Sequence, residues 1–251
     1  FNIKLPLNFN SPYKTANIVD FWRCWHITLS RFLRDYLYFP LGGNRRGSLR
    51  RYINLITTML LGGLWHGAGW NFVIWGGLHG FYLCTNHLWT AMYSNRKLPK
   101  TLPRPIAVFI TFIAVVFAWV FFRAVHFDQA IDIVYGMIGF NGFALPEALG
   151  IRIGTMRSYL ESSGIKFFLG GGQQFFYTYS WIIIAAIMAF LAPNSQELLA
   201  RFAPALTVEN QIYHPSQIRW SLHTRWAVGL GLIFTACFLS LSRPTEFLYF
   251  Q

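Results

Sequence analysis

The chain has 251 residues and a formal net charge of +12, because 21 Lys and Arg residues outnumber 9 Asp and Glu residues. Only 12% of the residues are charged, 54% are hydrophobic and 19% are aromatic, which excludes a disordered chain and is too apolar for the surface of a water-soluble domain. The 3 cysteines are too few for a disulfide scaffold, so a membrane protein remains.

Residues 17–37 (NIVDFWRCWHITLSRFLRDYL) are predicted to form one amphipathic helix, at the membrane interface or on the surface of a helical bundle. Asn17, followed three residues later by Asp20, is a helix-start signal, and Pro40 with the glycines after it ends the helix. At 100° per residue, charged and small polar side chains share one side. The opposite, apolar side comprises Phe21, Trp22, Trp25, Leu29, Phe32, Leu33 and Tyr36.

Basic residues gather in two short segments between apolar runs, residues 44–51 (NRRGSLRR) and residues 94–104 (SNRKLPKTLPR). This arrangement follows the positive-inside rule, so we place both segments on the cytoplasmic side. Nucleic-acid binding is the alternative for so basic a chain, but it predicts basic residues clustered on a polar domain. We therefore expect the lipid bilayer as a partner and no nucleic acid.

Residues 52–93 contain no charged side chain apart from histidine, and the segment is long enough for two membrane passes. Glycines are frequent between Gly62 and Gly80. Glycine permits close packing of helices, and it also permits broken helices around a funnel or pocket at membrane depth. Composition favours close packing, and both structures stay open at this point.

Three further apolar runs, residues 106–122, 175–192 and 226–242, each predict a membrane-spanning helix. Between the first two runs, residues 123–166 are predicted to form an excursion on the outer side. Within that excursion, residues 131–138 predict an interfacial helix.

Three of the seven histidines are candidates for chemistry. His66 lies inside the uncharged stretch, where an ionisable side chain is costly and marks a functional position. We expect a neutral imidazole there, the form that a general base needs, although a histidine that hydrogen-bonds a neighbouring helix fits equally well. His26 lies at the border between the two sides of the first predicted helix, and His79 is a weaker third candidate. No residue cluster has the spacing of a zinc site, so we predict no metal.

Three segments together resemble the membrane-bound O-acyltransferase family. They are FWRCWHITLS (residues 21–30), RDYLYFPLGGNR (residues 34–45) and GLWHGA (residues 63–68). The likeness is greatest to the branch of bacterial alginate O-acetyltransferase membrane subunits. One departure is Cys24, where that branch commonly has a basic residue.

The resemblance implies transfer of an acyl group from a thioester to a hydroxyl, with His66 as the catalytic residue and His26 as a second functional position. We expect Trp65, Trp22 and His79 to line or support the pocket. In the alginate branch the implied donor is cytosolic acetyl-CoA, with no tightly bound cofactor. The other expected partner is a polysaccharide or an acceptor protein outside the cytoplasm.

The predicted fold is therefore all-α: a polytopic transmembrane helical bundle with amphipathic interfacial helices and a Gly-rich broken-helix core. Residues 1–251 are expected to be one acyltransferase domain, with the amphipathic helix and basic loop in residues 1–51 and the transmembrane bundle in residues 52–251. We expect it to be the C-terminal half of a longer chain, in a bacterial inner membrane. It would acetylate a cell-surface polysaccharide such as alginate. The alternative is a transporter or channel subunit, because such subunits also have broken Gly-rich helices with buried histidines.

Overall fold

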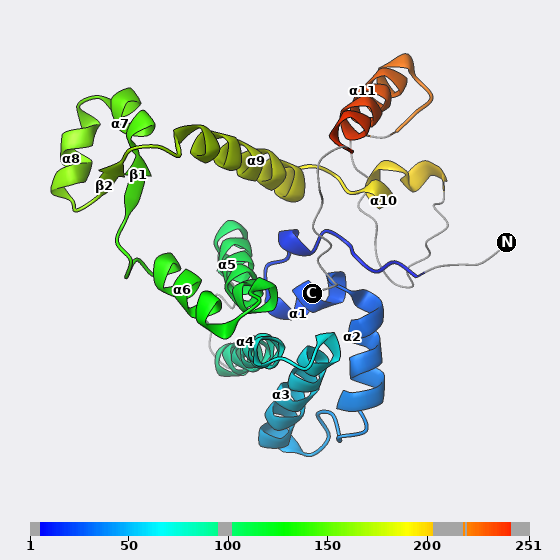
Figure 1. Ribbon diagram of the computed structural model, residues 1–251. Helices are drawn as coiled ribbons and strands as arrows, with labels where there is room; N and C mark the ends of the chain where they lie inside the picture. The colour runs from blue at the N-terminus through cyan, green and yellow to red at the C-terminus, as the bar shows by residue number, and fades with distance from the viewer. Residues whose placement is uncertain (1–5, 95–101, 203–217, 219, 242–251) are drawn as a thin grey trace. The chain divides into compact units, whose positions relative to one another are not determined.

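The computed structural model describes residues 6–94, 102–202, 218 and 220–241 (Figure 1). The chain forms two compact units, residues 8–192 and residues 1–7 together with 193–251. The basic segment at 94–104 lies mostly outside the described residues, so its predicted position is not considered further.

Most of the described chain is helical (Figure 1). The elements of residues 8–192 are the 3-10 turn Pro12–Lys14, α1 Ile18–Cys24, α2 Ile27–Leu33, the π-helical turn Arg34–Tyr38, α3 Gly47–His66, α4 Trp70–Ser94, α5 Arg104–Arg123, α6 Phe127–Met137, β1 Ala144–Pro146, α7 Glu147–Ile153, α8 Met156–Ser162, β2 Lys166–Phe168 and α9 Gly172–Leu191. The other unit contains α10 Ser195–Leu198, the 3-10 turn Ala200–Phe202 and α11 Thr224–Ser240.

Five helices coincide with the predicted apolar segments. The stretch at 52–93 contains α3 and α4, and the three later runs form α5, α9 and α11. Of these, α5 and α9 are long and apolar enough to cross a bilayer, with mean hydropathies of 2.6 and 1.6. Helix α11 is apolar but shorter. The interfacial segment predicted at 131–138 lies almost entirely within α6.

The glycines of residues 62–80 bring α3 and α4 into backbone contact. A Cβ atom added to Gly76 would lie 2.2 Å from the carbonyl oxygen of Met59, and one added to Gly63 would lie 2.1 Å from the carbonyl oxygen of Phe72. No side chain fits at such distances, so the two helices approach as closely as backbones allow. Of the two structures left open by the sequence, close helix packing is therefore the one that these glycines form.

The hydrophobic core of residues 8–192 lies where α1, α4 and α5 meet, with contributions from α3 and α6. Its buried members are Ile18, Phe21, Trp22, Met59, Trp75, Leu83, Val115, Ala118, Phe121 and Ala130. Aromatic side chains supply much of this core because each buries a large apolar area. The short helix α1 is thereby fixed against the long helices.

The prediction of one continuous helix over residues 17–37 is wrong. Its start is confirmed, since the side chain of Asn17 accepts a hydrogen bond from the backbone N–H of Asp20 at 2.8 Å. The helix then stops after α1, and α2 begins in a new direction because the chain turns at His26. The turn changes which side chains face inward, so Phe32 and Tyr36 are 51% and 69% exposed.

The expectation of an all-α chain also needs a small correction. Strands β1 and β2 pair in parallel, with Ala144 opposite Lys166. A parallel pair needs a long crossover connection, and α7 and α8 supply it. Within this crossover, Glu147 of α7 forms an ion pair with Arg157 of α8.

One buried hydrogen bond fixes the turn that precedes α3. The side chain of Asn54, which is 1% exposed, donates to the carbonyl oxygen of Gly43 at 2.9 Å. Replacing Asn54 with alanine should lower the free energy of unfolding by about 1–3 kcal/mol, because a buried carbonyl loses its donor. Thermal denaturation in detergent measures this. Asn44→Ala is the control, since Asn44 is exposed, and equal effects of the two substitutions would contradict the prediction.

Candidate functional site

The backbone at His26 is left-handed, with φ 42° and ψ 56°. Asn8 holds this conformation in place. Its carbonyl oxygen accepts a hydrogen bond from the N–H of Ile27 at 2.9 Å, and its Oδ1 accepts from the N–H and the hydroxyl of Thr28 at 3.1 and 2.9 Å. The first residues of α2 are therefore capped by another segment of the chain, and His26 is placed at the corner between α1 and α2.

The imidazole of His26 is half-buried. Its ring centroid lies 5.9 Å from that of Phe9 and 6.1 Å from that of Trp65. Burial lowers the pKa of His26 below its ordinary value, since water no longer solvates the charged form well. His26 is therefore neutral at pH 7. Its buried Nδ1 has no hydrogen-bond partner among the described residues.

His66 is the last residue of α3, directly before Gly67, where the chain turns into α4. Its half-buried ring is surrounded by other rings. The centroids of Trp65, Phe122 and Trp75 lie 4.9, 5.0 and 5.2 Å from that of His66, all three close to edge-on. These residues come from α3, α5 and α4, so three helices position the imidazole.

The structure brings together His26, Trp65 and His66, which the sequence separates by forty residues. The indole of Trp65 contacts both imidazoles, one edge-on at 6.1 Å and the other at 4.9 Å. Trp65 itself is 60% exposed. The predicted supporting residues Trp22 and His79 do not touch His66 in this way; they contact Trp75, on its far side.

An imidazole in this position can accept a proton from a hydroxyl group. The rings of Trp65, Trp75 and Phe122 that contact it carry no charge. In the ranges that the structure describes, no group of three or more histidine, cysteine or carboxylate side chains is arranged to bind a metal ion. A neutral imidazole has one free ring nitrogen and can act as a general base.

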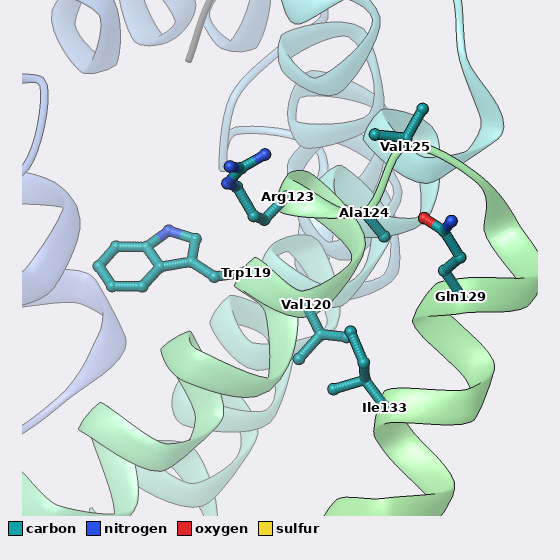
Figure 2. A pocket seen from close by; sticks show the side chains of 7 residues that line it. All are labelled: Trp119, Val120, Arg123, Ala124, Val125, Gln129 and Ile133. Carbon is teal, nitrogen blue, oxygen red and sulfur yellow. The ribbon is translucent and has the colours of Figure 1, made fainter. Parts of the chain in front are cut away.

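A groove of about 460 Å³ lies between the end of α5 and α6 (Figure 2). Its walls are mainly apolar, with Arg123 and Gln129 as its long polar side chains. No histidine lines it, so it is separate from the site around His66. The residues that line it are Trp119, Val120, Arg123, Ala124, Val125, Gln129 and Ile133.

Sequence reasoning missed three residues of this site: Trp75, Phe122 and Asn8. Trp75 precedes His79 by four residues, so helical spacing alone places the two rings on one face of α4. The contact of Phe122 with His66 and the hydrogen bonds of Asn8 have no local signal, because each joins segments that are distant in the sequence.

The left-handed backbone of His26 predicts that the stability of the protein depends on which residue stands at this position. Asparagine tolerates this conformation, whereas a β-branched residue does not. We expect His26→Val to lower the free energy of unfolding by roughly 1–2 kcal/mol relative to His26→Asn. Thermal unfolding of both variants in the same detergent measures the difference. Equal stability of the two variants would show that the turn relaxes without cost.

Comparison with known proteins finds one matching family and several relatives. Residues 1–125 match the membrane-bound O-acyltransferase family. The chain is 40% identical over 251 residues to the peptidoglycan O-acetyltransferase of Helicobacter pylori, covering 100% of this chain and 44% of the relative. It is 37% identical over 250 residues to the probable alginate O-acetylase AlgI of Azotobacter vinelandii, covering 97% and 47%.

A third relative is the probable alginate O-acetylase AlgI of Pseudomonas aeruginosa, 44% identical over 154 residues and covering 59% of this chain and 29% of the relative. The chain thus spans less than half the length of these curated relatives. The matched part includes both His26 and His66, because the family match extends over residues 1–125.

Proposed function

The chain belongs to the membrane-bound O-acyltransferase family, and from this premise we propose that it transfers an acetyl group to hydroxyls of a bacterial cell-surface polysaccharide. The donor is cytosolic acetyl-CoA, a substrate rather than a resident cofactor. The acceptor is a glycan such as alginate or peptidoglycan, since relatives are named for these two polymers.

The observation that carries this proposal is the convergence of His26 and His66 on the indole of Trp65. The two histidines lie in two of the three segments that resemble the family, and the fold brings them to one place. Buried histidines also occur in transport proteins, but two imidazoles held against one indole within family-like segments favour an acyltransferase, which needs a base next to its acceptor hydroxyl.

In the proposed reaction, the imidazole of His66 takes the proton from the acceptor hydroxyl. The hydroxyl oxygen attacks the thioester carbonyl, a C–O bond forms and the C–S bond breaks. The proton then passes from His66 to the departing thiolate, so that coenzyme A leaves as a thiol. His26 orients the donor or the acceptor across Trp65. The aromatic rings around His66 exclude water, which would otherwise hydrolyse the thioester.

The length of α3 supports a proposal for the location of the site relative to the membrane. His66 and the basic loop at 44–46 lie at opposite ends of this 20-residue helix, about 30 Å apart, which is the thickness of a bilayer core. We place the chain in a bacterial inner membrane as a multi-pass bundle over residues 52–251, within one domain of residues 1–251. With the basic loop in the cytoplasm, the thioester of the donor must then enter the bundle to reach His66.

A labelling experiment tests the proposed function. Membranes that contain the full-length protein are incubated with acetyl-CoA labelled in its acetyl group, together with alginate or with peptidoglycan. Label that appears on one glycan, and only when the protein is present, supports the proposal and identifies the acceptor. Movement of a solute across the membrane without label on any acceptor would instead establish the transport alternative.

A further inference from the structure

His79 is the most deeply buried titratable side chain among the described histidines, with 0% of its surface exposed. It lies on α4 and faces α1. Its ring centroid is 5.1 Å from that of Trp22 and 4.9 Å from that of Trp75. Phe21 and Tyr82 complete its surroundings. The proposed acyl transfer gives this residue no role.

The polar atoms of this cluster are all buried. Neither ring nitrogen of His79 has a hydrogen-bond partner among the described residues, and the same holds for Nε1 of Trp22 and of Trp75. A neutral imidazole offers one donor and one acceptor, and each indole offers one donor. Unpaired, these groups would destabilise the fold, and phenylalanine would fill the space without that cost. In the structure these nitrogens do not bond one another directly, so a buried water molecule, which can accept from an indole N–H and donate to the imidazole, is the partner that they can share.

The cluster reaches His66 through a single residue. The indole of Trp75 contacts both His79 and His66, with centroid distances of 4.9 and 5.2 Å. Trp75 is only 3% exposed, whereas Trp65 on the opposite side of His66 is 60% exposed. Trp75 is therefore the buried ring that packs against the imidazole of His66. The position of Trp75 depends in turn on His79 and Trp22.

We propose that His79 is a positioning residue for the reaction at His66: with Trp22 and Trp75 it forms a buried cluster, joined by ring contacts and bridged by water, that fixes Trp75 against the imidazole of His66. This inference rests on the proposed function of His66 as the base. It predicts that the nitrogen atoms of His79, and not only its volume, matter for catalysis. Small displacements of a base reduce the rate of the chemical step more than they reduce substrate binding.

The test compares His79→Phe with His79→Gln in the full-length protein, in membranes, with the labelled acetyl donor. We expect His79→Phe to lower kcat by about 10-fold to 100-fold with KM nearly unchanged, and His79→Gln to restore most of the loss. His87→Phe is the control, because His87 lies two turns further along α4 and is half-buried. It should retain wild-type kcat.

If His79→Phe does not fold, Trp22→Phe tests the same proposal. In the described part of the chain, no ring contact joins Trp22 to His66, whereas Trp22 contacts both Trp75 and His79, so this variant alters the cluster without removing a ring contact of His66. We expect a lower kcat with unchanged KM, and no further loss when Trp22→Phe is combined with His79→Gln. Wild-type kcat in both Trp22→Phe and His79→Phe would overturn the positioning role. Full activity of His66→Ala would instead overturn the proposed function itself.

Discussion

Replacing His66 with alanine should reduce acyl transfer by about 10²–10⁴-fold, the contribution of a general base. The substitution removes the imidazole at the end of α3 that we propose as the base for the acceptor hydroxyl. The neighbouring rings of Trp65, Trp75 and Phe122 stay in place as walls of the site. Transfer of labelled acetyl groups to the glycan, measured at equal amounts of membrane protein, gives the size of the loss.

Two further variants make this result specific. His66→Gln keeps a polar side chain of similar length without a basic ring nitrogen, and it should be as inactive as His66→Ala. His87→Ala removes a histidine from the middle of α4, away from the contacts of His66, and it should stay active. Acetylation at the wild-type level in both His66 variants would exclude a base at this position.

Adding a single methyl group at Gly76 is expected to destabilise the protein by about 1–3 kcal/mol or more. The Cβ atom of alanine at this position would lie 2.2 Å from the carbonyl oxygen of Met59. Backbone cannot move aside as a flexible side chain can, so α3 and α4 must separate. Gly76→Ala should therefore lower the thermal midpoint in detergent. It should also lower acyl transfer, because His66 and Trp75 lie on the two helices that separate.

Gly77→Ala is a matched control one residue away. A Cβ atom there would lie 3.5 Å from the side chain of Leu60, an ordinary contact distance. The same chemical change in the same helix should leave the thermal midpoint unchanged or raise it slightly, because alanine favours helix over glycine. If both alanine variants melted at the same temperature, the close contact at Gly76 would not limit stability.

The sequence was informative wherever a single segment carries its own signal. The apolar runs at 106–122 and 175–192 indicated α5 and α9, because span length and hydropathy are local properties. Asn17 indicated the start of α1 for the same reason, since its cap involves only Asp20. The family motifs drew attention to His26 and His66 before their distance in space was known.

The turn at His26 escaped prediction because its cause lies elsewhere in the chain. The residues around it have the periodicity of one helix, yet the hydrogen bonds from Ile27 and Thr28 go to Asn8. Tertiary contacts of this kind override local helix propensity. The position of Trp75 between His66 and His79 escaped for a similar reason, since it depends on how α3 and α1 pack against α4.

The backbone contact between α3 and α4 limits how reactants can travel to His66. At Gly63 and Gly76 the two helices leave no clearance even for one methyl group, so neither an acyl chain nor a sugar can thread between them. Trp65, which contacts His66, is 60% exposed, so we expect reactants to approach along the flank of the pair where it lies. Bulky substitutions along that flank should slow substrate entry. Substrate does not pass through the close contact between α3 and α4.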